Sequence, residues 1–432
     1  MGPRVDVRQE TIPAETRAVM PSPTSFATLL SASITRRRAL LERLGAEGTD
    51  CLRLLHGAVE GAPCLTVDRY GPILLAQTWR EPLGDGALEA MTAVASEALG
   101  ATLTPCWNHR GGPGGSAHDA DAMRAPIGHE LGLKYDVRPR HRGQDPLLFL
   151  DFRAGRRWLK AECRGRSVLN LFAYTCGIGV AALAGGARQV VNVDFSDTVL
   201  AIGRANAERN ASAADATALG ERFVTIVDDV IPVMRQFAGL PMPTRGKRAR
   251  FFTRRAPQQF DVVVLDPPRW AKGGFGAVDV VRDYASLFKP ALLATAPGGV
   301  VLATNHVPDV ALQDWLGSLE RVAVKAGRPL ASLDVISPEE DFPSPDGRPP
   351  LKIAHARPSS THPTNAAYPS KTFAAATITV VRLASNTWSG AHEDSVPCRV
   401  RTLRACASHD RPRGRSSHGG ADHHAGVSSQ AC

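Results

Sequence analysis

The feature that most constrains this chain is the stretch from Val168 to Gly186, VLNLFAYTCGIGVAALAGG. Apolar residues of strand character run into a short loop, and small apolar residues then continue at helical spacing, which predicts a buried strand that turns sharply into a helix. Gly177 and Gly179 carry no Cβ, so a ligand can lie directly against the backbone of that turn. A second short strand follows at 189–194 and ends in Asp194. In doubly wound sheets an acid there, about 20 residues past the loop, binds a ribose diol, so the pattern predicts a nucleoside-cofactor site.

The loop by itself leaves the class of nucleoside cofactor open. A dinucleotide-binding loop has the pattern G-x-G-x-x-G, which places a pyrophosphate at the N-terminus of a helix. Counting from Gly177, the position of the third glycine is held by Ala182. This difference disfavours a nicotinamide or flavin site, although a nicotinamide oxidoreductase stays among the alternatives.

A second feature lies downstream at residues 260–270, FDVVVLDPPRW, where an apolar strand leads to Asp266, Pro267 and Pro268. The two prolines have a fixed φ and no amide proton to donate. Asp-Pro-Pro at the end of a strand therefore predicts a rigid segment rich in hydrogen-bond acceptors, which suits an incoming amine.

These pieces together resemble the motif set of class I S-adenosylmethionine-dependent methyltransferases. The matching positions are the loop from Asn170 to Gly177, Asp194 after the second strand, Asp228 and Asp229 after the third, and DPPRW at 266–270. Within that class the chain is similar to the large-subunit ribosomal RNA methyltransferases that modify cytosine carbon-5 or guanine. Two upstream segments carry this narrower resemblance, residues 61–71 (GAPCLTVDRYG) and residues 143–153 (GQDPLLFLDFR), and all matches together span roughly residues 50 to 355.

The resemblance implies S-adenosyl-L-methionine as cofactor and RNA, ribosomal RNA first, as methyl acceptor. It assigns the cofactor to a set of residues around the strand ends: Asp151, Arg153, Asn170, Phe172, Tyr174, Thr175, Gly177, Asp194, Phe195, Asp228, Asp229 and Asp266. We expect Arg269, Trp270 and Tyr284 to contact the substrate, with Trp270 stacking on a flipped base or else packing in the core. A methyltransferase that acts on a protein or small molecule, and a noncatalytic RNA-binding relative, remain alternatives.

The expected acceptor is a nitrogen or oxygen atom. Cytosine carbon-5 becomes nucleophilic only after a thiolate adds to the ring. The similar cytosine enzymes place a cysteine just after the fifth strand, where this chain reads Ala-Thr-Asn-His at 303–306, and no cysteine occurs between Cys176 and Cys398. Besides Asp266 and the two prolines, the catalytic candidates are therefore Asn305 and His306, since a histidine can act as a base near neutral pH; structural roles for both stay open.

Strands and helices alternate from residue 168 onward. Strands are expected at 168–171, 189–194, 223–227, 260–265, 299–304 and 331–336. This alternation predicts an α/β fold, a Rossmann-like class I methyltransferase sheet that is mainly parallel and has helices on both faces, preceded by a small β-rich N-terminal unit. The predicted segments are a disordered N-terminus at 1–24, a helix and the β-rich unit at 25–145, the methyltransferase domain at 146–355, and a low-complexity, disordered tail at 356–432.

The net charge of +9 fits a partner made of phosphates, as does the basic insertion TRGKRARFFTRR at 244–255, although a solvated loop explains that insertion equally well. No run of apolar residues is long enough to span a membrane, and the N-terminus lacks the features of a secretory signal, so we expect a cytoplasmic protein. The eight cysteines form no C-x-x-C pair, which argues against a structural metal.

Overall fold

The structure is a computed structural model of the chain, and it describes residues 23–63, 65–111, 116–118, 123–140, 145–212, 218–242, 253–273, 276–344, 346–359 and 380–381. Most of the N-terminal segment, the C-terminal tail and most of the basic insertion lie outside these ranges. The predictions made for those segments are therefore not addressed by the structure.

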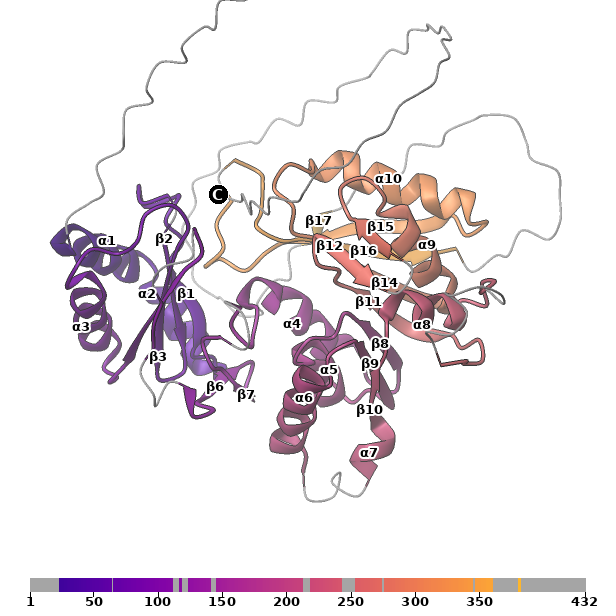
Figure 1. The fold of residues 1–432 in the computed structure, drawn as a ribbon, viewed down its shortest axis with the longest axis horizontal. Coiled ribbons are helices and arrows are strands. Elements are labelled where there is room, and N and C mark those ends of the chain that lie inside the picture. Colours follow the sequence, from indigo (N-terminus) through magenta and orange to yellow (C-terminus); the bar gives the residue numbers. More distant parts are fainter. Residues whose placement is uncertain are drawn as a thin grey trace, which may run out of the picture. The chain divides into compact units, whose positions relative to one another are not determined.

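The N-terminal unit is a five-stranded sheet in the order β1-β2-β3-β4-β5 with helices packed on one face (Figure 1). Its elements are α1 (Pro23–Arg36), α2 (Arg38–Ala46), β1 (Cys51–Leu55), β2 (Leu65–Tyr70), β3 (Ile73–Thr78), α3 (Ala87–Leu99), β4 (Thr104–His109) and β5 (Ser116–His118), followed by the hairpin β6 (Ile127–Glu130) and β7 (Leu133–Asp136). The expected small β-rich unit is thus present. The single helix expected before the β-rich unit is interrupted at Arg37, where the backbone leaves helical geometry and the guanidinium pairs with Glu60 at 2.8 Å.

The second part of the chain is built on an eight-stranded sheet, counted over the described residues, in the order β10-β9-β8-β11-β14-β16-β15-β17. Its elements are the 3-10 turn η2 (Leu150–Phe152), α4 (Arg153–Glu162), β8 (Ser167–Leu171), α5 (Gly177–Ala184), β9 (Gln189–Asp194), α6 (Asp197–Asn210), α7 (Leu219–Arg222), β10 (Phe223–Val227), α8 (Val230–Phe237), β11 (Phe260–Leu265), β12 (Trp270–Gly273), β13 (Gly276–Asp279), α9 (Ala285–Leu293), β14 (Thr295–Asn305), α10 (Leu312–Lys325), β15 (Leu330–Ile336), β16 (Lys352–Pro358) and β17 (Val380–Val381). The neighbours β10, β9, β8, β11 and β14 are parallel, and β16 is antiparallel to both β14 and β15.

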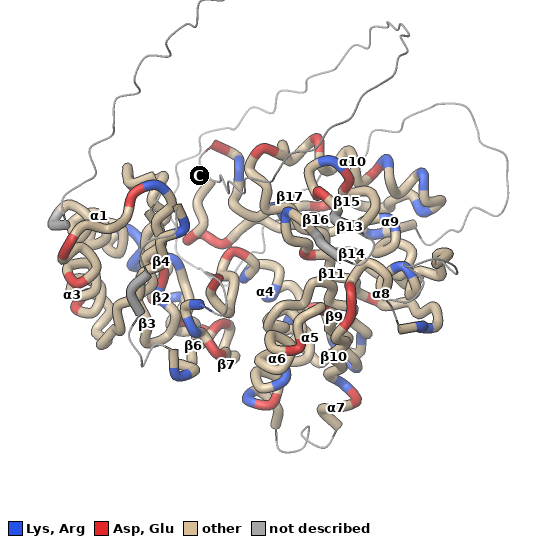
Figure 2. The backbone as a smooth tube through the Cα atoms, in the orientation of Figure 1, with Lys and Arg blue, Asp and Glu red and all other residues tan. Residues whose placement is uncertain are grey.

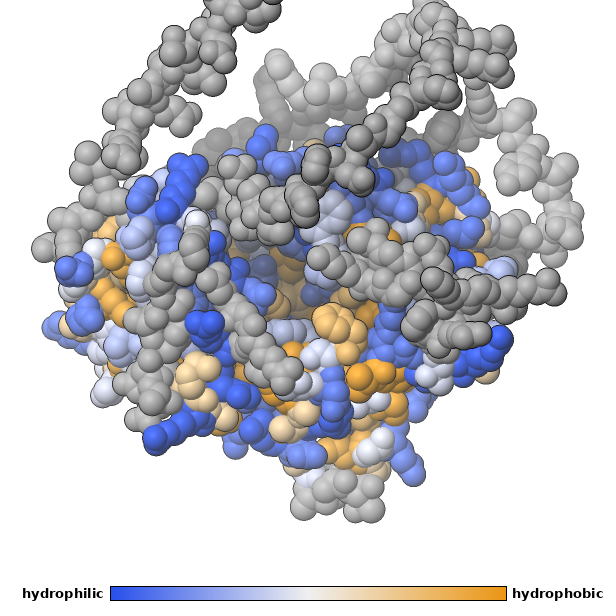
Figure 3. Space-filling view, in the orientation of Figure 1, coloured by the Kyte–Doolittle hydropathy of each residue, from blue (hydrophilic) through white to orange (hydrophobic). Residues whose placement is uncertain are grey.

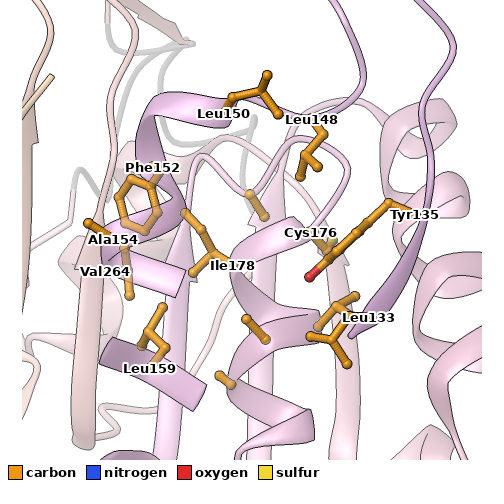
Figure 4. Packing of buried hydrophobic residues seen from close by; sticks show 14 of the residues in the cluster. Leu133, Tyr135, Leu148, Leu150, Phe152, Ala154, Leu159, Cys176, Ile178 and Val264 are labelled. Carbon is orange, nitrogen blue, oxygen red and sulfur yellow. The ribbon is translucent and has the colours of Figure 1, made fainter. Parts of the chain in front are cut away.

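Helices cover both faces of this sheet because adjacent strand residues point to opposite sides. On one face Val168, Val190 and Val262 pack with α4, α5 and α6. On the other face Leu169, Val191 and Val263 pack with α8, α9 and α10. Figure 4 shows one end of the buried cluster on the α4, α5 and α6 face, where Tyr135 and Leu148 lie over the loop that carries Cys176. The predicted fold class is confirmed. No helix in the described ranges is long and apolar enough to cross a membrane.

The buried cluster that contains Val168, α4, α5 and α6 continues from the eight-stranded sheet into the N-terminal sheet. There it lies on the face opposite to α1 and α3. Tyr70, Ile73 and Leu75 belong to the same buried cluster as residues of α4, α5 and β8. The Tyr70 hydroxyl donates a hydrogen bond to the carbonyl of Leu148 at 3.0 Å. The segment that precedes α4 is therefore held between the N-terminal sheet and the loop that follows β8.

Candidate active site

Five neighbouring parallel strands, β10, β9, β8, β11 and β14, end at one edge of the sheet, which we call the carboxyl edge. The residues at or just past these ends are Asp228 after β10, Asp194 at the end of β9, the loop 172–177 after β8, Asp266 after β11 and His306 after β14. Ligands of doubly wound sheets bind beyond such an edge. The predicted cofactor residues at these strand ends therefore lie along one edge of the sheet.

The loop after β8 has an unusual backbone. Phe172, Tyr174 and Cys176 all have positive φ, at 60°, 48° and 57°. A non-glycine residue in this region costs about 1–3 kcal/mol, so surrounding contacts must impose the conformation. The hydroxyl of Tyr174 donates to the carbonyl of residue 146 at 3.3 Å, and that of Thr175 donates to the carbonyl of residue 147 at 2.5 Å. These bonds hold the loop against the segment before α4.

Asp194 holds the same loop from the other side. One carboxylate oxygen accepts the backbone N–H of Tyr174 at 3.0 Å, and the other accepts that of Ser196 at 3.0 Å. Burial raises the pKa of Asp194 above its ordinary value, while the backbone hydrogen bonds oppose that shift. Each oxygen keeps a lone pair, so the predicted role toward a ribose diol is compatible with this arrangement.

Glycine is needed at positions 177 and 179 for a different reason from the one expected. A Cβ built on Gly179 would lie 2.2 Å from Oδ1 of Asn192 in β9, and one on Gly177 would lie 3.1 Å from Cδ1 of Leu148. In both cases the missing side chain makes room for protein atoms. The prediction that these Cβ positions are open to a ligand is therefore wrong, because Asn192 of β9 and Leu148 of the segment before α4 occupy them.

Two exposed apolar side chains lie beside the carboxylates at the ends of β9 and β10. Phe195 is 74% exposed and Val227 is 49% exposed. Val227 is the register partner of Asp194, so both apolar groups lie next to Asp194 and Asp228. Figure 3 shows apolar side chains at the surface over this part of the sheet. A flat heteroaromatic ring with polar edges fits such a combination, so the residues present suit the predicted nucleoside cofactor.

Asp228 and Asp229 have separate roles in the structure. Asp229 is the N-cap of α8 and accepts the backbone N–H of Ile231 at 3.0 Å. Asp228 accepts a hydrogen bond from Nη2 of Arg255 at 3.0 Å. Arg255 is the last residue of the basic insertion, and its contact with Asp228 was not predicted, because no local sequence pattern links residues 27 positions apart.

Asp266 lies directly after β11 and accepts a hydrogen bond from the hydroxyl of Thr304 in β14. Burial raises the pKa of Asp266 to about 6, the Thr304 hydrogen bond opposes this shift, and the nearby Asp151 adds to it. The following Pro267 is buried and Pro268 is exposed. A partly buried acid that titrates near neutral pH can both accept hydrogen bonds and receive a proton.

Asp151, in η2, provides a second carboxylate beside Asp266. Burial raises the pKa of Asp151, whereas the positive charges of Arg53 and Arg156 lower it. Asp151 is partly exposed, and within the described part of the chain no other side chain donates a hydrogen bond to it. Asp151 is therefore free to accept a hydrogen bond from a ligand.

Asn305 is the last residue of β14, and His306 directly follows it. Asn305 is 2% exposed and its Oδ1 accepts the backbone N–H of Val307 at 2.9 Å, while its buried Nδ2 has no hydrogen-bond partner among the residues that the structure describes. Burial lowers the pKa of His306, and the charges of Lys352 and Arg269 lower it further. The imidazole is therefore neutral at pH 7. The catalytic roles of both residues stay predictions.

The three residues predicted to contact substrate are placed differently. Arg269 is exposed and Trp270 is 50% exposed, at the start of the β12–β13 hairpin. Tyr284 is 6% exposed, stacks edge-on against Trp315, and donates its hydroxyl to the carbonyl of Thr304 at 2.7 Å. The substrate-binding prediction for Tyr284 is wrong, because its ring is buried in the core and its hydroxyl is hydrogen-bonded to the backbone of β14.

Two residues assigned to the cofactor are also internal. Arg153 is 0% exposed, and its guanidinium is bonded to Glu130, Asp341 and the carbonyl of residue 51. Asn170 is 0% exposed and donates to Oδ1 of Asn192 at 2.9 Å. Neither side chain can reach a cofactor in this structure, so these two predictions are wrong. The guanidinium of Arg153 is held in buried ion pairs, and the side chain of Asn170 is hydrogen-bonded inside the protein.

The cysteines within the described ranges, at positions 51, 106, 163 and 176, are all buried. Cys176 is in the loop after β8, but its sulfur packs against α6, where a Cβ on Gly203 would lie 2.4 Å from it. Burial raises the pKa of the Cys176 thiol well above its usual range. A neutral, enclosed thiol is not an effective nucleophile.

Charge is distributed rather than concentrated. Figure 2 shows basic and acidic residues interspersed along the described backbone. No group of three or more histidine, cysteine, aspartate or glutamate side chains that could hold a metal ion occurs in the described residues. An acceptor therefore has to be recognised by particular residues at the carboxyl edge.

The sequence and the fold both match known proteins. Residues 65–224 match the pattern of the S-adenosylmethionine-dependent methyltransferase family. The ribosomal RNA large subunit methyltransferase I of Aeromonas salmonicida is 30% identical over 319 residues, which cover 71% of this chain and 73% of that protein. A ribosomal RNA large subunit methyltransferase of Deinococcus radiodurans is 29% identical over 314 residues, covering 70% and 71%.

Two solved structures share the fold. A methyltransferase crystallised with SAH superposes with a TM-score of 0.62 at 22% identity, over 79% of this chain and 83% of the other. A SAM-dependent methyltransferase from Streptococcus mutans gives a TM-score of 0.61 at 21% identity, over 79% and 82%. At these identities the likeness concerns the fold.

Proposed function

Because the chain belongs to the class I S-adenosylmethionine-dependent methyltransferases, in the family of the ribosomal RNA large-subunit enzymes, we propose that it methylates a nitrogen atom on a base of ribosomal RNA. The observation that carries the proposal is Asp266, a carboxylate with a pKa of about 6 at the carboxyl edge, fixed by Thr304. RNA as acceptor rests on the names of the relatives. Nitrogen as the acceptor atom rests on this chain's own residues.

The cofactor would be held at the ends of β8, β9 and β10. Asp194 accepts hydrogen bonds at the end of β9, Phe195 and Val227 offer apolar surface for the base, and Asp228 supplies a further acceptor. When bound, S-adenosylmethionine supplies an electrophilic methyl group. The protein then has to orient the acceptor lone pair and exclude water, and such positioning is worth about 7–11 kcal/mol.

Asp266 suits an exocyclic amine as the acceptor. Its hydroxyl partner Thr304 occupies one oxygen, which leaves the other to accept an N–H of the amine. Hydrogen bonds to Asp266 and to the neighbouring Pro267 carbonyl would keep the nitrogen lone pair localised. On transfer the sulfur–methyl bond would break and leave S-adenosylhomocysteine, and the methylated nitrogen would pass its extra proton to the Asp266 carboxylate. Asp151 is a second acceptor for that proton.

The residues around this site argue against methylation at carbon-5 of cytosine. That reaction requires a thiolate beside the substrate ring. In the described ranges every cysteine is buried, and β14 ends in Asn305, which is followed by His306. An amine needs no covalent activation, so the arrangement around Asp266 is sufficient for it.

On the substrate side, Trp270 is the residue best placed to contact a base. Half of its surface is exposed, and it lies four residues after Asp266. Stacking of a base on an aromatic side chain is worth about 1–3 kcal/mol. The adjacent Arg269 is also exposed and can pair with a phosphate.

The proposal is tested by transfer of labelled methyl from S-adenosylmethionine to ribosomal RNA purified from a strain that lacks this gene, followed by mass spectrometry of the nucleosides. We expect an N-methylated guanine or adenine nucleoside. Labelled 5-methylcytosine would contradict the choice of nitrogen. Cofactor binding without label in RNA would point to a protein or small-molecule acceptor.

A further inference from the structure

Arg255 forms an ion pair at the carboxyl edge that has no counterpart in the sequence motifs. Its Nη2 lies 3.0 Å from Oδ2 of Asp228, and the two side chains are only 24% and 11% exposed. Asp228 directly follows β10 and is one of the acids assigned to the cofactor. Arg255 is the last residue of the basic insertion at 244–255, for which the sequence suggested RNA contact or a solvated loop.

The backbone around Arg255 is fixed by α8, the helix that starts next to Asp228. The side-chain amide of Gln236, near the end of α8, donates to the carbonyl of Thr253 at 3.0 Å and accepts the backbone N–H of Arg255 at 2.8 Å. The backbone N–H of Gln258 then donates to the carbonyl of Phe237 at 3.0 Å. Gln236 is 6% exposed, so this clamp is part of the folded core. Arg255 is therefore held in place by residues other than its ion-pair partner.

The hydrogen bonds of Asp228 show what Arg255 does to it. Oδ1 accepts the backbone N–H of Asp229 at 2.9 Å, and Oδ2 accepts Nη2 of Arg255. The backbone N–H of Asp228 donates to the carbonyl of Asp194 at 3.0 Å. A carboxylate has about four lone-pair sites, so each oxygen keeps one. With both oxygens tied, the carboxylate cannot rotate freely, and its remaining lone pairs have a defined direction.

The position of Asp228 indicates which part of the cofactor it would meet. Asp194 ends β9, and Asp228 lies just past the end of the neighbouring edge strand β10, with the exposed Phe195 and Val227 beside them. If the ribose is at Asp194, the next group outward along a nucleoside is the base. An adenine base carries an exocyclic amine, which donates hydrogen bonds that a fixed carboxylate accepts.

We propose that Arg255 is a positioning residue of the cofactor site, which orients Asp228 so that Asp228 can accept a hydrogen bond from the adenine of the cofactor. The inference rests on the proposed cofactor site and not on RNA as the acceptor. Arg255 is thus separated in function from the other basic residues of the insertion.

The test is calorimetric binding of S-adenosylhomocysteine to the full-length protein. Arg255→Ala is expected to weaken binding by about tenfold, the scale of one charge-assisted hydrogen bond. Arg254→Ala is the matched control, because Arg254 is the adjacent residue, has the same charge and is exposed. It should bind as the wild type does. Thermal unfolding of each variant reports whether the fold is retained.

A double-mutant cycle distinguishes positioning through Asp228 from a general effect. If Arg255 acts through Asp228, Arg255→Ala should cause no further loss in an Asp228→Asn background. Unchanged affinity of Arg255→Ala, an equal loss in Arg254→Ala, or additive losses in the cycle would each overturn the inference. Failure of the wild type to bind S-adenosylhomocysteine would instead overturn the proposed function and the inference with it.

Discussion

At the scale of single residues, Asp266 is the group on which the proposed chemistry depends. Asp266→Asn keeps the shape of the side chain and the contact with Thr304 but removes the carboxylate. We expect methyl transfer to fall by about 10²- to 10⁴-fold, the usual contribution of a general base, with cofactor affinity nearly unchanged. Single-turnover transfer and calorimetry measure the two quantities. Activity equal to that of the wild type would remove Asp266 from the mechanism.

The raised pKa of Asp266 predicts a pH dependence. The carboxylate is the active form, so the rate should rise with pH and level off above about 6, the pKa that burial gives to this acid. The same shift means that the folded protein binds this proton more tightly than the unfolded chain, so the contribution of Asp266 to stability falls as pH rises toward 6. A profile of kcat/KM against pH checks the first statement. The Asp266→Asn variant should lack that inflection.

At the scale of elements, Gly179 determines how α5 packs on β9. A Cβ at this position would lie 2.2 Å from Oδ1 of Asn192, which also accepts a hydrogen bond from Asn170 at 2.9 Å. Gly179→Ala should therefore destabilise the protein by about 1–3 kcal/mol through overpacking. Gly45→Ala, in the last turn of α2 with no described atom near its Cβ position, should be neutral or stabilising. Urea unfolding of both variants compares the two; equal stabilities would show that Asn192 moves aside without cost.

The elements of the sheet were predictable because buried parallel strands are nearly continuous apolar runs. β9, β10 and β11 have the predicted bounds, and the convergence of their ends followed from their parallel order. The break at Arg37 and the β12–β13 hairpin were not predicted, because they depend on contacts with distant residues and on glycines that permit several turns. At the site, Asp266 was found from a local motif, whereas Arg255 required the fold.

At the scale of the whole molecule, a buried ionic cluster joins the N-terminal unit to the catalytic part. Glu130 of β6 accepts from Arg153 and Arg156 of α4, and Arg153 also pairs with Asp341 at 2.9 Å. Burial acts to lower the pKa of Arg153, but Asp341 and Glu130 raise it above its ordinary value, so the guanidinium stays charged. The partners of Arg153 lie 23 and 188 residues away in the chain, so the resemblance of residues 143–153 to a family segment could not distinguish an internal role from cofactor binding.

Two adjacent acids allow the contribution of this cluster to be measured. Asp341 is completely buried with Arg153, whereas Glu340 pairs with Arg43 at 2.7 Å with side chains 69% and 42% exposed. Removing one partner of a buried pair leaves a charge without compensation and costs about 3–5 kcal/mol, while an exposed pair contributes about 0–1 kcal/mol. Asp341→Asn should therefore shift the urea midpoint far more than Glu340→Gln. Similar shifts for the two variants would mean that Glu130 alone neutralises Arg153, and that the loop carrying Asp341 is not needed to hold the N-terminal sheet beside the carboxyl edge.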